Sequence, residues 1–565
     1  MRKWLVSFAL LVCSSVLWGE EVAVTDESLP RLPNPTPFQQ EVLVSKCRGL
    51  ILVGKQSELL SARELRNVEG LRVIDLDVPG GEERLDKKLR PLYLNQAITR
   101  PSLEEIQDTI RDYYRGYHRP FIIVEVPEQD VTDGVLQIVV FESQLGKVEI
   151  QGNTWTSTKR MENYLHLDPG QMINQQSLLS DLDFINRNPF RRADIIYAPG
   201  EKEGTTDVIL HVDDRRPYRF YAGAENTGVP TTDRQRWFAG FNWGNVFGLD
   251  HIFAYQYTAS YDVDKFQSHT GQYIAPLPWH HVFDVYGGAS WVHLDLDEPS
   301  MDSHGFSSQL SGRYVIPFFL GLYLRQECVI GFDWKRTNNT IEFTDDFPTF
   351  GKNVNLTQFV FTYAGSYERN AYRLDFEGSF YWSPGRWVSD QTDADFESLR
   401  PGAKNHWVYF LASFSYLQRL PKSFSLFLLA EGQLSSQNLL PSEQFGLGGY
   451  DTVRGYNQRE VSTENGLLLS GEVRSPALPL FSNIKRMKQV DAIQFLAFLD
   501  YGYGRYKKTL PFETKNQYLL GIGPGIRYTL EPYFTARLDW GIKLHKEARY
   551  GGGNTMVHFA VTGSY

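Results

Sequence analysis

The segment GLGGYDTVRGYNQRE (446–460) combines an arginine with glycines and bulky side chains, yet it follows neither a helix nor a strand period. Arg454 lies in it between Val453 and the pair Gly455–Tyr456. An arginine guanidinium can pair with one carboxylate through two parallel hydrogen bonds. A buried acid could therefore hold this loop in one position. The alternative is that Arg454 is an ordinary solvated charge.

The segment FLAFLDYGYGR, further along the chain, offers such an acid. Successive side chains of a strand point to opposite faces, so Phe495, Ala497, Leu499 and Tyr501 share one apolar face. Phe498, Asp500 and Gly502 fall on the other face. If the apolar face contacts lipid, Asp500 points into the interior of a barrel, where Arg454 can reach it.

Catalytic and cofactor-binding patterns are missing from the sequence. It contains no P-loop, no G-x-S-x-G, no H-E-x-x-H and no Cys/His metal spacing. Its three cysteines do not indicate a disulfide framework, and a net charge of −10 gives no indication of nucleic-acid binding. We therefore predict neither an enzyme nor a protein that needs a metal or cofactor.

The N-terminus has the features of an exported protein. A basic start, Met1–Arg2–Lys3, precedes the apolar run WLVSFALLVCSSVLW, which is shorter than the roughly 18 residues that span a membrane. We predict a signal peptide over 1–19. Residues 20–69 are predicted to be a lead-in with a proline-rich linker, in which the strand-like GLILVG belongs to no module.

Residues 70–215 contain two copies of one arrangement of strands and helices. In the first copy, 70–143, a strand GLRVIDLDVPG precedes a helix in which Ser102 and Glu105 have the spacing of a capping box. In the second copy, 144–215, GKVEIQG precedes the helix QSLLSDLDFINRN. Two strands close each copy. The pattern predicts two α+β modules of the β-α-α-β-β type.

From 216 to 565 short alternating strands replace the helix signals. We count about sixteen strand-like segments, and tight turns such as RLPKS alternate with long loops. The last strand, MVHFAVTGSY, carries Phe559 and ends on Tyr565, which resembles the C-terminal signal of bacterial outer-membrane barrels. A soluble sandwich would also alternate, but usually with shorter strands. We predict an all-β transmembrane barrel of about sixteen antiparallel strands, with 437–464 as its sixth outer loop and FLAFLDYGYGR as its thirteenth strand.

Several segments resemble one family of transporters. The order VPEQDVTDGVLQIVVFES…LGKVEIQGN resembles the junction of the first and second POTRA (polypeptide-transport-associated) modules of two-partner secretion transporters, of the haemolysin secretion/activation type. The motifs VRGY (453–456) and FLD-Y-G (498–502) are similar to two hallmark motifs of that superfamily. The resemblance implies that Arg454 contacts Asp500 and that transport needs this contact. It also implies that Gly455 permits a tight turn, while Tyr456 and Phe498 pack around the loop tip.

The same resemblance implies a function. An outer-membrane pore of this kind recognises an exported partner in the periplasm through its POTRA modules and translocates it unfolded to the cell surface without ATP. The implied partners are a large, β-helical secreted exoprotein, outer-membrane lipid, and the barrel assembly machinery during biogenesis. The main alternative is an assembly factor of the same superfamily, which usually carries more POTRA modules. A passive porin or a barrel enzyme would explain neither the module pair nor the loop motif.

Overall fold

A computed structural model describes residues 42–565 except 118, 120, 203, 294–303, 321–322, 340–349, 482–489, 512 and 546–552. The predicted signal peptide and most of the predicted linker therefore lie outside the described residues. The chain separates into two compact units, one up to Arg215 and one from Arg216 to Tyr565, and each is described by itself. In the described part, no helix is both long and apolar enough to cross a membrane.

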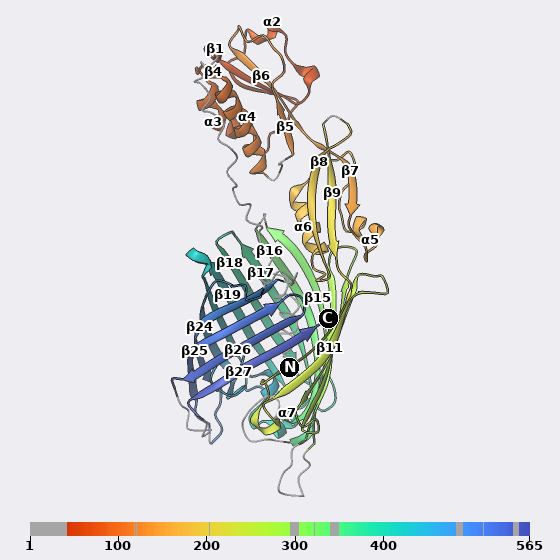
Figure 1. Cartoon of the computed structure of the whole chain (residues 1–565), viewed down its shortest axis with the longest axis vertical. Helices are drawn as coiled ribbons and strands as arrows, with labels where there is room; N and C mark the ends of the chain where they lie inside the picture. The colour runs from red at the N-terminus through yellow and green to blue at the C-terminus, as the bar shows by residue number, and fades with distance from the viewer. Residues whose placement is uncertain are drawn as a thin grey trace. The chain divides into compact units, whose positions relative to one another are not determined.

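The first α+β module has a four-stranded sheet in the order β3-β2-β6-β5, with two helices on one face (Figure 1). Strand β2 pairs in parallel with both β3 and β6. The helix face buries Leu50, Leu52 and Ile138 against Leu89 and Ile110. Its elements are β2 Gly49–Val53, β3 Gly70–Ile74, α3 Glu82–Tyr93, α4 Arg100–Arg115, β5 Ile122–Glu125 and β6 Val135–Glu142.

The start of this module differs from the prediction. The first strand of the β-α-α-β-β pattern is β2, which lies in the predicted lead-in 20–69, and GLRVIDLDVPG supplies only the edge strand β3. All five residues of β2 are buried. A parallel strand covered on both faces is a continuous apolar run without alternation, so the sequence pattern does not show where it belongs. The module therefore begins before residue 70.

The segment between β2 and β3 covers the second face of the sheet. It contains η1 Gln56–Glu58 and α2 Ala62–Leu65, and it buries Leu65 and Val68 against Ile51 and Val53. A short β1 (Val42–Val44) pairs with β4 (Ile98–Thr99). Helix α4 is capped by Thr99, whose side chain shares a capping box with Ser102. The predicted Ser102–Glu105 box is therefore wrong by one turn, because the helix begins at Arg100.

The second α+β module has the same topology without the additional edge strand. Its sheet has the order β7-β9-β8, and β7 pairs in parallel with β9 as β2 does with β6. Asn174 caps α6 by accepting hydrogen bonds from the backbone N–H groups of Gln176 and Ser177. The elements are β7 Gln144–Gln151, α5 Thr158–Glu162, α6 Gln175–Ile185, β8 Arg191–Pro199 and β9 Thr205–Asp214.

The second unit is a closed antiparallel barrel. Within the described residues sixteen strands pair in sequence order, and the last pairs with the first (Figure 1). An even, closed set leaves no strand edge facing lipid. The strands are β10 Tyr218–Glu225, β11 Arg236–Val246, β12 His251–Ser260, β13 Phe266–Pro276, β14 Val282–His293, β15 His304–Leu320, β16 Leu324–Asn339, β17 Phe350–Glu368, β18 Tyr372–Pro384, β19 His406–Arg419, β20 Ser425–Ser435, β23 Asn465–Arg474, β24 Asp491–Arg505, β25 Asn516–Leu530, β26 Phe534–Lys543 and β27 Thr555–Ser564.

Within the described residues, the fifth outer loop of the barrel contains an α-helix and the sixth contains a pair of strands. The fifth connects β18 to β19 and contains α7 Asp393–Leu399. The sixth connects β20 to β23 and contains η4 Pro441–Glu443 and the paired strands β21 Phe445–Leu447 and β22 Val461–Thr463. This order agrees with the prediction that 437–464 is the sixth outer loop and β24 the thirteenth strand. Short 3-10 turns η2 Pro230–Thr232 and η3 Pro421–Ser423 lie in other connections.

Candidate functional site

Arg454, in the sixth outer loop, lies against the inner wall of the barrel and is 3% exposed. Its Nε and one terminal nitrogen donate to the two carboxylate oxygens of Asp500 at 2.7 and 2.8 Å. Its backbone N–H donates to the same carboxylate at 3.1 Å. Paired, charge-assisted hydrogen bonds of this kind are among the strongest polar contacts in proteins. The structure thus brings together the two residues that the sequence singled out.

The alternation of β24 explains why the acid points inward. Phe495 and Leu499 are 47% and 51% exposed on the outer surface, whereas Phe498 and Asp500 are buried inside. The guanidinium of Arg454 lies 3.6 Å from the centre of the Phe498 ring, in a cation–π contact. Both wall residues of the predicted motif therefore contact the arginine directly.

Two more wall carboxylates reach Arg454. Glu472 on β23 accepts a hydrogen bond from it at 2.6 Å, and Asp539 on β26 lies 3.8 Å from it. Three arginines of the wall share these acids: Arg474 with Glu472, and Arg527 and Arg537 with Asp539. Charge pairing satisfies each buried carboxylate, because an unpaired buried charge is costly. The site is an ion-pair network of these three wall acids and four arginines, which Asp451 of the loop joins through Arg537 at 3.3 Å.

Burial and charge act in opposite directions on Arg454. Burial acts to lower its pKa, but the hydrogen bonds and charges of Asp500, together with Glu472, outweigh burial and raise the pKa above its ordinary value. The guanidinium therefore stays charged in its buried position. Removing any one acid would lower the pKa of Arg454, but the guanidinium would remain charged.

Glycines give the loop backbone room to approach the wall. Gly455 has φ +100°, a conformation that other residues rarely adopt. A Cβ added at wall position Gly541 would lie 2.2 Å from the Gly455 nitrogen, and one at Gly521 would lie 2.1 Å from the Arg454 oxygen. A Cβ at Gly502 would lie 2.8 Å from the side chain of Val453. Three neighbouring strands thus share a groove of glycines under the loop tip.

Tyr456 and a buried histidine hold the other side of the tip. The Tyr456 hydroxyl donates to the backbone oxygen of Leu520 at 3.1 Å and also contacts the backbone oxygen of His545. The ammonium of Lys543 lies 4.8 Å from the centre of the Tyr456 ring. The Gly455 N–H donates to Nε2 of His558 at 3.0 Å. These contacts bind the loop tip to β25–β27.

The predicted C-terminal residues belong to the seam of the barrel. The Phe559 N–H donates to the side chain of Asn226 at 2.9 Å. Tyr565 exchanges two backbone hydrogen bonds with Phe220 of β10, at 2.8 and 2.9 Å. Both residues therefore take part in joining the last strand to the first.

Sequence reasoning missed Glu472, Asp539, His558 and the wall glycines Gly521 and Gly541. The alternation rule could have placed the acids on the inner face of their strands. It does not show which inner residues meet the loop.

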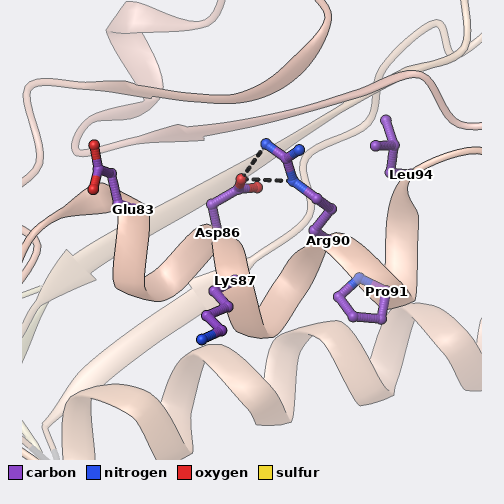
Figure 2. Close-up of a pocket in the computed structure, with 6 residues that line it drawn as sticks. All are labelled: Glu83, Asp86, Lys87, Arg90, Pro91 and Leu94. Atoms are coloured by element: carbon purple, nitrogen blue, oxygen red, sulfur yellow. Dashed lines mark hydrogen bonds and ion pairs between the residues drawn. The ribbon is translucent and has the colours of Figure 1, made fainter.

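A surface hollow on α3, shown in Figure 2, does not resemble a reactive site. One helix and its end supply all of its lining, which includes the ion pair Asp86–Arg90 at 2.5 Å. Tyr93 also donates to Asp86. These charges are mutually satisfied within the helix, so the hollow offers no chemistry of its own.

A closed sixteen-stranded barrel, two POTRA modules and an arginine-bearing loop fixed to the lumen wall define an outer-membrane protein transporter of the POTRA–barrel class. The chain belongs to the family of haemolysin secretion/activation proteins ShlB/FhaC/HecB, whose model matches residues 204–528. A second model, POTRA (surface antigen variable number repeat), matches residues 144–215. The protein is therefore an outer-membrane transporter with its POTRA modules in the periplasm, and its family is one of secretion channels.

Similar proteins cover most of the chain. The heme/hemopexin transporter protein HuxB of Haemophilus influenzae (strain 86-028NP) is 22% identical over 462 residues, which is 77% of this chain and 76% of HuxB. The outer membrane transporter CdiB of Dickeya dadantii (strain 3937) is 24% identical over 425 residues, 71% of each chain. The solved structure of CdiB from Escherichia coli has a TM-score of 0.73 at 18% identity and covers 100% of this chain and 97% of CdiB.

Proposed function

We propose that this protein captures one exported partner protein in the periplasm and passes it unfolded through the barrel to the cell surface. The observation that carries this proposal is the sixth outer loop, which is bound to the lumen wall through Arg454 and Asp500. A passive pore does not need such a loop. In our proposal the Arg454–Asp500 contact holds the loop in the transport-competent state. The packing of the loop tip against the wall involves five further residues: Val453, Gly455, Tyr456, Phe498 and Gly502.

Capture would occur by strand addition, in which an extended segment of the partner pairs with an open sheet edge through backbone hydrogen bonds. In the first module, β3 covers the edge of β2. In the second module, β8 pairs only with β9 among the described strands, and its Ile196 and Tyr197 are 51% and 40% exposed. We therefore assign capture to β8, whose backbone edge tolerates many partner sequences.

The remaining partners follow from the proposed route. The cargo is a large secreted exoprotein of β-helical type, and its folding outside the cell supplies the driving force in place of ATP. Exposed apolar side chains such as Phe495 and Leu499 contact outer-membrane lipid. The barrel assembly machinery inserts the protein. No metal or cofactor takes part, and transport involves no catalytic step.

Deletion of the gene tests this function against the alternative of a barrel assembly factor. We expect the deletion strain to lose one large protein from its culture medium, while the amounts of other outer-membrane barrels stay unchanged. Expression of the wild-type gene from a plasmid should restore that protein. A general fall in outer-membrane barrels, with secretion otherwise intact, would show an assembly factor instead.

A further inference from the structure

The sixth outer loop has a second attachment to the wall, at Glu443 in η4. The Glu443 carboxylate is fully buried, with 0% side-chain exposure. Lys335 on β16 donates to it at 2.5 Å, Tyr409 on β19 at 2.8 Å, and Gln358 on β17 at 3.1 Å. None of these residues belongs to the network around Arg454.

Wall residues hold these partners in place. Gln358 also donates to Asp333 at 2.9 Å, and Arg313 donates to the same acid at 2.6 Å. Gln433 on β20 donates to the backbone oxygen of Glu443 at 2.9 Å. Glu443 is therefore fixed by a preformed polar cluster rather than by one flexible lysine.

The two attachments involve different sets of wall strands. Glu443 contacts the seventh, eighth and tenth strands, whereas Arg454 contacts the twelfth, thirteenth and fifteenth. In a closed barrel of sixteen strands, the seventh and the fifteenth are half the circumference apart. The loop is therefore attached to the wall along an arc that runs from the seventh strand to the fifteenth.

We propose that the Lys335–Glu443 ion pair is a latch that keeps the pore closed until the partner enters, while the Arg454–Asp500 contact keeps the loop tip bound for transport. This inference rests on the proposed transport function. Separating a buried ion pair is costly as long as no water reaches the two charges, because each lone charge then remains desolvated. Water that enters with an unfolded partner hydrates both charges and removes that penalty. The ion pair is therefore stable in the closed pore and unstable in the pore that contains the partner. Glu443 and Lys335 act as positioning residues.

Single-channel recording of the full-length protein in planar lipid bilayers tests this latch. We expect Lys335→Met to raise the fraction of time that the pore is open by at least about tenfold, which corresponds to about 1.4 kcal/mol. Glu443→Gln should also raise the open fraction, because it leaves the Lys335 ammonium without its buried partner carboxylate. The matched control is Arg373→Met, which breaks the ion pair with Asp375 within one wall strand and should leave the pore closed.

An open fraction in Lys335→Met equal to those of wild type and Arg373→Met would overturn the latch. If Lys335→Met fails to assemble, as shown by loss of the heat-dependent mobility of a folded barrel on gels, Glu443→Gln decides alone. An unchanged open fraction in that variant would then overturn the latch. Unchanged secretion after gene deletion would refute the proposed transport function. The single-channel recording does not depend on that result, so the two failures can be told apart.

Discussion

Replacing Gly541 with alanine adds one methyl group under the loop tip and changes no charge. The added Cβ would lie 2.2 Å from the Gly455 nitrogen and 2.5 Å from its Cα, whereas ordinary contacts begin at 3.4 Å. The loop backbone must therefore retreat by roughly 1.2 Å, a shift of the size that overpacking forces in a close-packed site. Arg454, the preceding residue, moves with it.

This retreat breaks the contact with Asp500. The two side-chain hydrogen bonds measure 2.7 and 2.8 Å, and a shift of this size takes them beyond hydrogen-bonding distance. Each bond to a charged group contributes about 1.5–3 kcal/mol. A loss of at least about 3 kcal/mol lowers the population of the seated loop by roughly 100-fold. We expect faster tryptic cleavage of the sixth loop on intact cells and a matching fall in partner secretion.

Gly312 on β15 provides the control, because a Cβ added there meets nothing within 4 Å. Gly312→Ala should behave as wild type in both assays. If Gly541→Ala also left loop cleavage and secretion at wild-type levels, the close approach of loop and wall would have no role in transport, and the reasoning would be refuted.

Three further substitutions separate the parts of the site. Asp500→Asn keeps the shape but removes the charge; because Glu472 still pairs with Arg454, secretion should fall without being abolished, and full secretion would contradict this. Tyr456→Phe removes the hydroxyl bonded to Leu520, at a cost of about 1–2 kcal/mol, and should lower secretion about 5- to 30-fold, less than Gly541→Ala does; wild-type secretion would contradict this. Ile51→Asp places a charge in the buried strand β2 and should make the first POTRA module protease-sensitive while the barrel still assembles; a resistant module would refute the core role of β2.

Alternation explains what could be predicted from the sequence. A lipid-facing strand must present apolar side chains at every second position, so FLAFLDYGYGR indicates that Asp500 points inward. The same rule and the loop lengths predict the strand number and the order of the loops. Those features depend only on local pattern and chain order, which a single sequence records.

The remaining features depend on distant parts of the chain. Alternation gives the face of Glu472 and Asp539 but not their height in the barrel, which the stagger of neighbouring strands determines. The path of the loop then selects the residues that it contacts, including Lys335 on the far wall. The sequence indicated a strand at β2 but not its place in the first module, since a strand buried on both faces carries no period. Tertiary packing therefore determines both which wall residues contact the loop and where β2 lies in its sheet.

Secretion of the partner by cells that carry Arg454→Ala tests the central claim most directly. The variant removes every side-chain contact with Asp500, Glu472 and Phe498 while the barrel strands are unchanged. Arg505→Ala, which replaces an exposed arginine at the end of β24, is the control. We predict that Arg454→Ala reaches the outer membrane in normal amounts and secretes no partner, whereas Arg505→Ala secretes normally. Normal secretion by Arg454→Ala would contradict the account.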